Sequence, residues 1–595
     1  MTEEAAFTDA KLSRRQFMGT AAAGAAALGA VAGATSLIPG VAAAPSQGAG
    51  GFETAAGRSA QSVPVPKNWS QTTDVVVIGY GGAGAVTAIT AFDSGAEVII
   101  LEKSPSLASL GIKGTTPTYS ISGGGGNTHM CAGAIIWPTD PIAGANHLYD
   151  ISWGATPMDV CQAWATWANQ EKAWLDSMGI KYTVSAASTA EFPTLPGAST
   201  IFGLSTTGQG PAFFLALDQQ VQKRGIPILF NTAGTDLIQD PNTKEILGVQ
   251  AFSNDSEVLN IQAKRGVVIC TGGFEYNDTM KLNFLKSYPY HGLGWPYNTG
   301  DGIKMAQKVG AGLWHMNAVS AFMRQWYPSL SPISLYCSVS GYGYVWVNKY
   351  GQRFYNEVTG ATFTHTWNYA LSDFDLTEPG YDRIPTFLIF DETTRLKGPV
   401  MGTTSYAAAV LPPQFGGIPA WSKDNSAEIA AGYILKGATS ITDLANTINQ
   451  AHWECNDPKD WQEDRVNAPS IDMVVPMNAN NLNAVVNQWN ADCAAGKGDT
   501  VFGRTATQMA PISTPPFYAV AMWPGGPNTQ GGPVRDARAR ILDADGNPIP
   551  RLYGNGECGS IWGFLYAGSG GDMSELIAFG RISGNNAAAE NPWTS

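Results

Sequence analysis

The chain has 595 residues, a formal net charge of −13 at pH 7, and 44% apolar against 14% charged residues. Its length allows a large core divided between two domains. The negative charge argues against nucleic acid or an anionic membrane as a partner. The seven cysteines stand singly, without a C-x-x-C pair, so their spacing gives no support for zinc binding or haem attachment.

The N-terminus has the composition of an export signal. The run SRRQFM at 13–18 resembles a twin-arginine signal, an apolar stretch rich in Ala and Gly follows over 21–38, and AAA at 42–44 suits cleavage. The alternative is a membrane anchor, but the stretch is only weakly hydrophobic. We therefore expect a signal peptide over 1–44, a linker over 45–72, and a periplasmic or other extracytoplasmic location, with membrane association left open.

Residues 74–103 have the pattern of a nucleotide-binding strand, turn, helix and strand. Val75 to Ile78 form a short apolar run that is typical of a buried parallel strand. Three glycines follow with the G-x-G-x-x-G spacing that makes the turn, admits a pyrophosphate to the helix start and packs the helix: Gly79, Gly81 and Gly84. A second strand over 98–101 ends at Glu102, whose carboxylate can accept bonds from ribose hydroxyls. The plain alternative is a glycine-rich turn without a ligand.

A series of later motifs, in matching order and spacing, resembles a flavoprotein superfamily that includes soluble fumarate reductases and 3-ketosteroid dehydrogenases. The motifs are GGNT (125–128), TGGF (271–274), TGDG (299–302), VNKYGQRFYNE (347–357), FYAV (517–520), TQGG (529–532), LYGNGE (552–557) and IAFGRISGNNAA (577–588). The resemblance implies an α/β fold with a Rossmann-type FAD-binding domain of the glutathione-reductase kind. That domain would be in two parts, 73–285 and 505–595, with an α+β substrate-capping domain inserted at 286–504.

The same resemblance implies which residues hold FAD. The nucleotide unit would contribute Gly79, Gly81, Gly82, Ala83, Gly84, Glu102 and Lys103. The pyrophosphate and the isoalloxazine edge would meet Gly125, Gly126, Asn127, Thr128 and Gly133, and the adenosine side would meet Thr271, Gly272 and Gly273. Asp301 would lie near the ribityl or pyrophosphate and Glu557 on the ribityl chain, with Ser574 and Leu576 in the C-terminal helix.

Two further points about the cofactor follow from this resemblance. The turn over 570–574 opens a helix whose positive N-terminus can face flavin N1 and O2 and stabilise the anionic reduced flavin. Membrane-bound relatives attach FAD covalently through a histidine. The place of that histidine falls on Asn127 in this chain, so we expect FAD to be bound non-covalently.

The chain departs from the family where the chemistry is done. Fumarate reductases place an arginine acid, and ketosteroid dehydrogenases a tyrosine base, about four residues after the Glu of R-F-x-N-E, where this chain has Ala361. The histidine and arginine that bind the carboxylates in fumarate reductases are replaced by Asn528 and Ala567. A dicarboxylate needs fixed positive charges. The sequence therefore disfavours fumarate as the substrate.

The remaining site residues resemble the ketosteroid enzymes. Tyr566, in Y-A-G-x-G, looks like the tyrosine of their Y-P-G-x-G, and Tyr518 matches a tyrosine that hydrogen-bonds the substrate ketone. Such a phenol would polarise the conjugated C=C and stabilise the enolate. The candidates for the acid or base, each of which could instead be a packed aromatic, are Tyr342 and Tyr344 first, then Tyr355, Tyr369 and His365. Four tryptophans could line an aromatic substrate pocket or simply the core: Trp295, Trp314, Trp326 and Trp346.

These features predict an exported FAD-dependent oxidoreductase that transfers a hydride between flavin N5 and the C=C of an enone, steroid-like or aromatic, with reduction as the preferred direction. Because the chain has no haem motif, its electron partner would be a separate cytochrome, quinone or membrane protein. One alternative is a reductase of an unsaturated acid of the acrylate, urocanate or cinnamate type, which needs a clamp from Arg324, Arg383 or Arg395. Another is a non-catalytic flavin electron-relay subunit, which the loss of the usual acid at Ala361 keeps open.

Overall fold

The computed structural model describes residues 63–106, 123–254, 256–325, 333–358, 365, 367–377, 380–402, 421–451, 453–454, 472–473 and 475–593. The predicted signal peptide, the linker as far as residue 62, Trp326 and Ala361 lie outside these ranges, as does the side chain of Arg324.

The last residues of the predicted linker are part of the fold. Ser70 N donates to Asn260 O at 2.8 Å, and strand β1 (Gln71–Ile78) already begins at Gln71. The ring of Trp69 packs near that of Trp593, with the ring centroids 6.4 Å apart. The linker prediction is therefore wrong for these residues, because backbone hydrogen bonds and an aromatic contact hold them on the sheet.

The first sheet has parallel strands at its centre, in the order β24-β25-β9-β1-β2-β6. β1 pairs in parallel with β2 and β9, and β25, from the C-terminal part, pairs in parallel with β9. The antiparallel pair β7 and β8 continues from β9. The other bounds are β2 Val98–Leu101, β6 Ile228–Leu229, β7 Thr232–Gln239, β8 Ile246–Ser253, β9 Glu257–Ile269, β24 Arg540–Leu542 and β25 Pro548–Gly554. The predicted strand at 75–78 is confirmed, and its side chains are buried.

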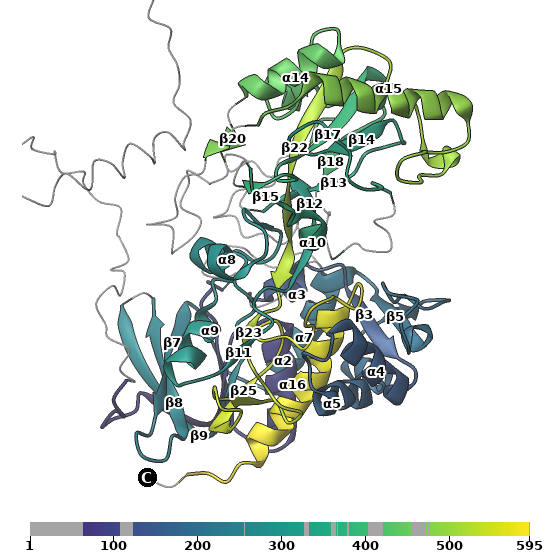
Figure 1. Ribbon diagram of the computed structural model, residues 1–595. Coiled ribbons are helices and arrows are strands. Elements are labelled where there is room, and N and C mark those ends of the chain that lie inside the picture. The colour runs from purple at the N-terminus through teal and green to yellow at the C-terminus, as the bar shows by residue number, and fades with distance from the viewer. Residues whose placement is uncertain are drawn as a thin grey trace, which may run out of the picture. The chain divides into compact units, whose positions relative to one another are not determined.

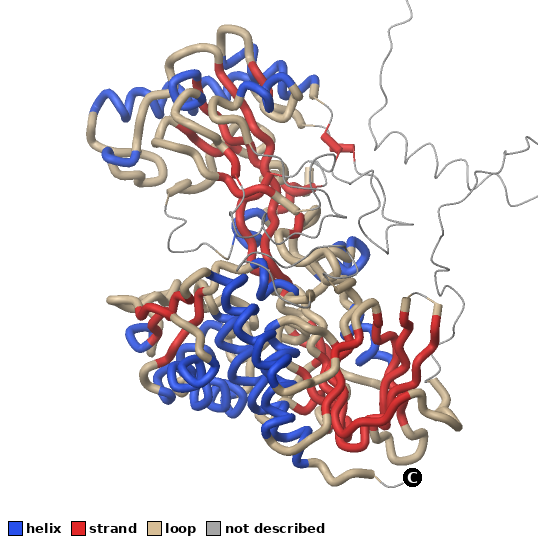
Figure 2. The backbone as a smooth tube through the Cα atoms, turned by 180° about the vertical axis from the view of Figure 1, so that it is seen from behind, coloured by secondary structure: helices blue, strands red, loops and turns tan. Residues whose placement is uncertain are grey.

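Helices cover this sheet through apolar faces. α2 (Gly82–Asp93) and α16 (Gly571–Ala589) lie side by side (Figure 1) and share one core with α5 and α7. Figure 2 shows these helices from behind, next to the strands. The other elements here are α3 Gly126–Met130, α4 Pro141–Ile151, α5 Met158–Ala168, α6 Glu171–Met178, α7 Gln209–Lys223, α8 Asp278–Phe284, α9 Asp301–Lys308, η1 Ala198–Thr200, and the small sheets β3 Ala134–Pro138 with β4 Tyr182–Val184 and β5 Ile201–Thr206, and β11 Leu313–Trp314 with β23 Gly532–Pro533.

A second sheet has the order β14-β17-β22-β12-β13-β18, with β10 and β19 also paired to β22. Its bounds are β10 His291–Gly292, β12 Val319–Gln325, β13 Leu335–Cys337, β14 Tyr344–Val347, β17 Thr386–Asp391, β18 Met401–Gly402, β19 Leu435–Lys436 and β22 Phe517–Thr529. The helices beside it and the short elements are α10 Trp367–Leu371, α11 Glu392–Arg395, α13 Ser426–Ala430, α14 Ile441–Gln450, α15 Ala479–Ala495, η5 Ala506–Gln508, β15 Phe374–Asp375, β16 Gly380–Tyr381, β20 Trp453–Glu454 and β21 Asp472–Met473.

The long strand β22 belongs to the second core for half its length. Phe517 to Trp523 pack there with β14, β17 and α15, and Ile512 joins them. The boundary predicted at 504/505 falls before this strand. The chain thus continues in the second core for about 20 residues beyond that boundary before its last strands and helix join the first sheet.

Candidate functional site

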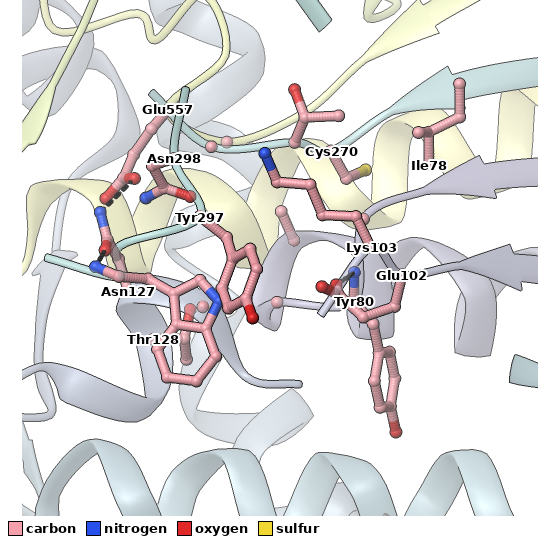
Figure 3. A pocket seen from close by; sticks show the side chains of 18 of the residues that line it. Ile78, Tyr80, Glu102, Lys103, Asn127, Thr128, Cys270, Tyr297, Asn298 and Glu557 are labelled. Atoms are coloured by element: carbon pink, nitrogen blue, oxygen red, sulfur yellow. Dashed lines mark hydrogen bonds between the residues drawn. The ribbon is translucent and has the colours of Figure 1, made fainter. Parts of the chain in front are cut away.

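A pocket with about 800 Å³ of empty space, including space open to solvent, lies where the carboxyl ends of β1, β2 and β9 meet the N-terminus of α2. Ligands of open α/β sheets bind at this edge, beyond the ends of the parallel strands. The walls are completed by residues near the start of α9 and α16. Figure 3 shows side chains from these separate segments converging on the pocket.

The glycines of the first turn fit a dinucleotide. Gly79 has a φ of +102°, and a Cβ there would lie 2.3 Å from the carbonyl oxygen of Cys270. A Cβ on Gly84 would lie 2.0 Å from the oxygen of Gly79, so the helix can pack on the turn only without a side chain. At Gly81 the closest protein atom would be 3.5 Å away. Its missing side chain therefore leaves space for a ligand beside the backbone, as a bound pyrophosphate requires.

Charged groups mark the end of the pocket beside β2. The carboxylate of Glu102 accepts from Tyr80 N at 2.7 Å and from Ser104 N at 2.8 Å, which fixes its orientation. Lys103 Nζ lies 2.7 Å from Asp301 Oδ2. Burial disfavours the charged form of Asp301, but the charge of Lys103 and its hydrogen bond hold the Asp301 pKa below its usual value. Asp301 is thus fixed on the same side of the pocket as Glu102.

In another part of the wall, Asn127 links two buried carboxyl groups. Its Nδ2 donates to Glu557 Oε2 at 2.8 Å (Figure 3). It also donates to Glu275 Oε1 at 2.9 Å, and Asn298 Nδ2 donates to the same oxygen at 2.8 Å. Burial raises the pKa of Glu275 to about 7 and that of Glu557 well above its usual value. A carboxyl group in its neutral form can donate a hydrogen bond as well as accept one.

The first turn of α16 forms another part of the wall. Asp572, which lines the pocket, accepts from the amide of Asn528 and from Gln530 Nε2 at 3.2 Å. Its backbone N–H donates to the hydroxyl of Tyr566 at 3.1 Å. Burial raises the pKa of Asp572 to about 6. The wall therefore presents amide and hydroxyl groups around a carboxyl group, and Gly570, with a φ of +101°, lets the chain turn into the helix.

Most of the residues predicted for FAD line this pocket: Gly79, Gly81, Gly82, Ala83, Glu102, Lys103, Gly126, Asn127, Thr128, Thr271, Gly272, Asp301, Glu557 and Leu576. Four others, Gly84, Gly125, Gly133 and Gly273, pack against neighbouring protein atoms behind it. Ser574 does not face the pocket. Its hydroxyl accepts from Trp164 Nε1 at 3.0 Å and donates to Glu171 at 2.7 Å, because this side of α16 packs against α5 and α6.

The sequence reasoning did not name several lining residues: Tyr80, Thr232, Ala233, Gly234, Tyr297, Asn298 and Asp572. Trp295, for which a substrate pocket and the core were both left open, lines this pocket. Tyr297 and Asn298 lie just before TGDG and could have been found as its flank. Asp572 could have been found as the acid in the first turn of the C-terminal helix.

The structure does not bring Tyr518, the predicted ketone contact, to this pocket. Its hydroxyl donates to Glu392 Oε2 at 2.6 Å, and its ring stacks on that of Phe390 in the second core. Asn528, which is bonded to the pocket residue Asp572, lies ten positions further along β22. At about 3.3 Å per residue this places the two residues roughly 30 Å apart.

The leading candidates for the acid or base, Tyr342 and Tyr344, are misplaced for the same reason. Tyr344 is opposite Phe390, which is itself opposite Tyr518, so the three rings stand in one row across the second sheet. Tyr342 is 41% exposed, and its backbone oxygen accepts from Ala510 N. Neither tyrosine lines the pocket. The sequence could not reveal this, because the residues around them do not show which end of the second sheet they occupy.

The remaining aromatic candidates divide into two groups. Tyr355 packs on Trp367 in the second core, and the Tyr369 hydroxyl donates to the backbone oxygen of Phe564. His365 and Tyr566 lie together, with ring centroids 4.8 Å apart, next to Asp572. The structure thus brings Tyr566 into contact with Asp572, which lines the pocket, and His365 into contact with Tyr566.

A family model described as "FAD binding domain" matches residues 74–572. The chain belongs to this FAD-binding family. It is 25% identical over 531 residues to the NADH:fumarate oxidoreductase of Klebsiella pneumoniae, covering 87% of this chain but only about half, 47%, of that protein's length. It is also 25% identical over 580 residues to the digoxin reductase of Eggerthella lenta, covering 89% of each.

The fold is shared with a solved structure, a 3-ketosteroid Δ1-dehydrogenase from Sterolibacterium denitrificans in complex with 1,4-androstadiene-3,17-dione. The TM-score is 0.68 at 22% identity, over 87% of this chain and all of that chain. The family match and the sequence relatives, not this structure, confirm the predicted cofactor, FAD, and the predicted enzyme class, an FAD-dependent oxidoreductase whose homologues act on CH–CH groups. In the part of the chain that the structure describes, no helix is both long and apolar enough to span a bilayer.

Proposed function

We propose that this chain is an exported oxidoreductase that reduces the C=C of an enone, a steroid-like or aromatic unsaturated ketone, with non-covalently bound FAD. The observation that carries this proposal is the wall at the start of α16. There the hydroxyl of Tyr566 and the amides of Asn528 and Gln530 surround Asp572. These amide and hydroxyl groups are uncharged and suit an uncharged ketone, whereas a carboxylate substrate would face the buried acidic group that they surround.

The charges around the pocket support an uncharged substrate. Lys103 is the single cation among the described lining residues, and it pairs with Asp301. Two of the arginines considered for a carboxylate clamp are paired with acids elsewhere: Arg383 with Asp373 at 2.7 Å and Arg395 with Glu392 at 2.6 Å. These pairs disfavour the alternative of an unsaturated carboxylic acid as substrate.

In this proposal each part of the wall has a task. When bound, FAD supplies the hydride in the reductive direction and accepts it in the oxidative direction. Tyr566 donates a hydrogen bond to the ketone oxygen and stabilises the enolate that forms as the hydride adds to the far carbon of the C=C. Asp572 orients Tyr566 through its backbone N–H. The matched relatives named for digoxin and for a ketosteroid favour a flat, apolar substrate.

We further propose that the second sheet and its helices cap the substrate. Two residues of the middle segment support this, because His365 contacts Tyr566 and Tyr369 bonds to Phe564, both in the C-terminal part of the chain. The electron donor would be a separate cytochrome, quinone or membrane protein. Export rests on the twin arginines Arg14 and Arg15. The relatives named above are enzymes, which disfavours a non-catalytic relay subunit.

The test is oxidation of the reduced protein. The FAD-loaded protein is reduced with one equivalent of dithionite without oxygen and mixed with 4-phenyl-3-buten-2-one, 1,4-androstadiene-3,17-dione, cinnamate or fumarate, while flavin absorbance is followed. At least one ketone should reoxidise the flavin faster than either acid. Faster reoxidation by fumarate or cinnamate would refute the proposed substrate class.

A further inference from the structure

His365 is held in a buried pair with a carboxylate from a distant part of the chain. Its Nδ1 is hydrogen-bonded to Glu191 Oε1, and the two side chains are only 9% and 6% exposed. The backbone N–H of Glu191 donates to Ala567 O at 3.2 Å, which anchors the pair to the turn just before α16. The imidazole is thus fixed relative to the same turn that carries Tyr566.

The imidazole also lies beside the pocket wall. Its ring packs between Tyr566, at 4.8 Å between centroids, and Phe322, at 4.9 Å. The hydroxyl of Tyr566 accepts a hydrogen bond from the backbone N–H of Asp572, and Asp572 is one of the residues that line the pocket. Contacts through Tyr566 thus connect the ring to Asp572 in the first turn of α16, whereas Tyr342 and Tyr344 belong to the far end of the second sheet.

This arrangement suits proton transfer. A carboxylate that accepts a hydrogen bond from Nδ1 favours the tautomer with its proton on that nitrogen. The other ring nitrogen, Nε2, lies on the opposite side of the ring from Glu191. It is then the nitrogen that gives or takes a proton.

We propose that His365 is the catalytic acid that protonates the substrate carbon next to the ketone, with Glu191 as its positioning residue. This role rests on the proposed function. In reduction the far carbon of the C=C gains a hydride, two electrons and one proton, from the reduced cofactor, and negative charge moves onto the ketone oxygen. The Nε2–H bond then breaks as a C–H bond forms at the near carbon. The neutral imidazole regains its proton from water, so the substrate gains two hydrogens and the cofactor is oxidised.

The experiment compares His365→Gln and Glu191→Gln with His147→Gln. His147 is a matched control, because it is also buried and its Nδ1 is bonded at 3.0 Å, but to the backbone oxygen of Pro196 in another part of the fold. The probe is 4-phenyl-3-buten-2-one or 1,4-androstadiene-3,17-dione, whichever the wild type reduces faster. Bound FAD is measured in every variant, so loss of cofactor is seen separately from loss of rate.

His365→Gln should retain FAD but reoxidise about 10²- to 10⁴-fold more slowly. Glu191→Gln should lower kcat with little change in KM, and His147→Gln should leave the rate within threefold of wild type. Imidazole added to His365→Ala should restore part of the rate, which a purely structural role would not allow. In protein labelled with ¹⁵N-histidine and free of substrate, one ring N–H signal should vanish in His365→Gln, shift in Glu191→Gln and stay unchanged in His147→Gln.

The outcomes separate this role from the proposed function. If the wild type reduces neither enone, the proposed function fails and the role of His365 fails with it. If the wild type is active and His365→Gln stays within threefold of its rate, or His147→Gln loses as much as His365→Gln, the role of His365 alone is refuted.

Discussion

Replacing two tyrosines, one at a time, by phenylalanine tests where the ketone is bound. Tyr566→Phe removes the hydroxyl bonded to Asp572 N at the pocket wall. Losing one donor to a developing oxyanion costs about 10²- to 10³-fold in rate, or about 2.7–4 kcal/mol. Tyr518→Phe removes a hydroxyl roughly 30 Å away along β22, by the rise of an extended strand. That distance is too long for any contact with the same substrate, so the rate should stay within twofold of wild type.

The stability of Tyr518→Phe provides a control for this comparison. Tyr518→Phe loses one hydrogen bond to Glu392, which remains paired with Arg395 at 2.6 Å. The free energy of unfolding should therefore fall by about 1 kcal/mol. The assay is reoxidation of dithionite-reduced protein by 4-phenyl-3-buten-2-one in a stopped-flow spectrometer, with FAD content checked first. A large rate loss in Tyr518→Phe, with Tyr566→Phe near wild type, would refute the placement of the substrate.

Three further results are expected. Gly81→Ala should leave the apoprotein folded, because the new Cβ comes no closer than 3.5 Å to protein atoms, but it should weaken FAD binding in a fluorescence titration. Gly84→Ala should instead destabilise the fold, because its Cβ would lie 2.0 Å from Gly79 O. Equal FAD affinity in Gly81→Ala and wild type would contradict the role given to this turn in binding the pyrophosphate. In FAD-free protein, burial raises the pKa of Glu275 from 4.5 to about 7, so between these pH values the folded state holds a proton that the unfolded state releases. The free energy of unfolding should therefore fall as the pH rises from 4.5 to 7. Urea unfolding of Glu275→Gln should show a smaller fall over this range, and identical pH profiles of variant and wild type would contradict the prediction. Arg14→Lys with Arg15→Lys should keep the full chain in the cytoplasm, as fractionation would reveal, and unchanged export would refute the twin-arginine route.

The sequence allowed the cofactor site to be predicted because its determinants are local. Gly79, Gly81 and Gly84 act through the turn that they form themselves, and Glu102 follows the next strand directly. The spacing of these residues therefore carries their geometry. Asn127 and Glu557 come from separate motifs, and their order in the family pattern was enough to bring both to the pocket.

The catalytic side could not be read in this way, because its contacts are distant in sequence. Tyr518 and Asn528 belong to one strand, but only the register of β22 against β17 and β12 reveals which end meets the pocket. His365 meets Glu191 across 174 residues, and no spacing predicts such a pair. Ser574 illustrates a local failure: it is in the correct helix but on the side that packs against Trp164.

The central claim is that the wall at Tyr566, Asn528 and Asp572 accepts a ketone and rejects a carboxylate. Its most direct test is a matched pair of substrates, 4-phenyl-3-buten-2-one and cinnamate, which share the styryl C=C and differ in a methyl ketone against a carboxylate. With wild-type protein reduced under anaerobic conditions, the ketone should reoxidise the flavin at least about 10²-fold faster, since burying an unpaired carboxylate costs several kcal/mol. Equal rates, or faster reoxidation by cinnamate, would contradict the claim.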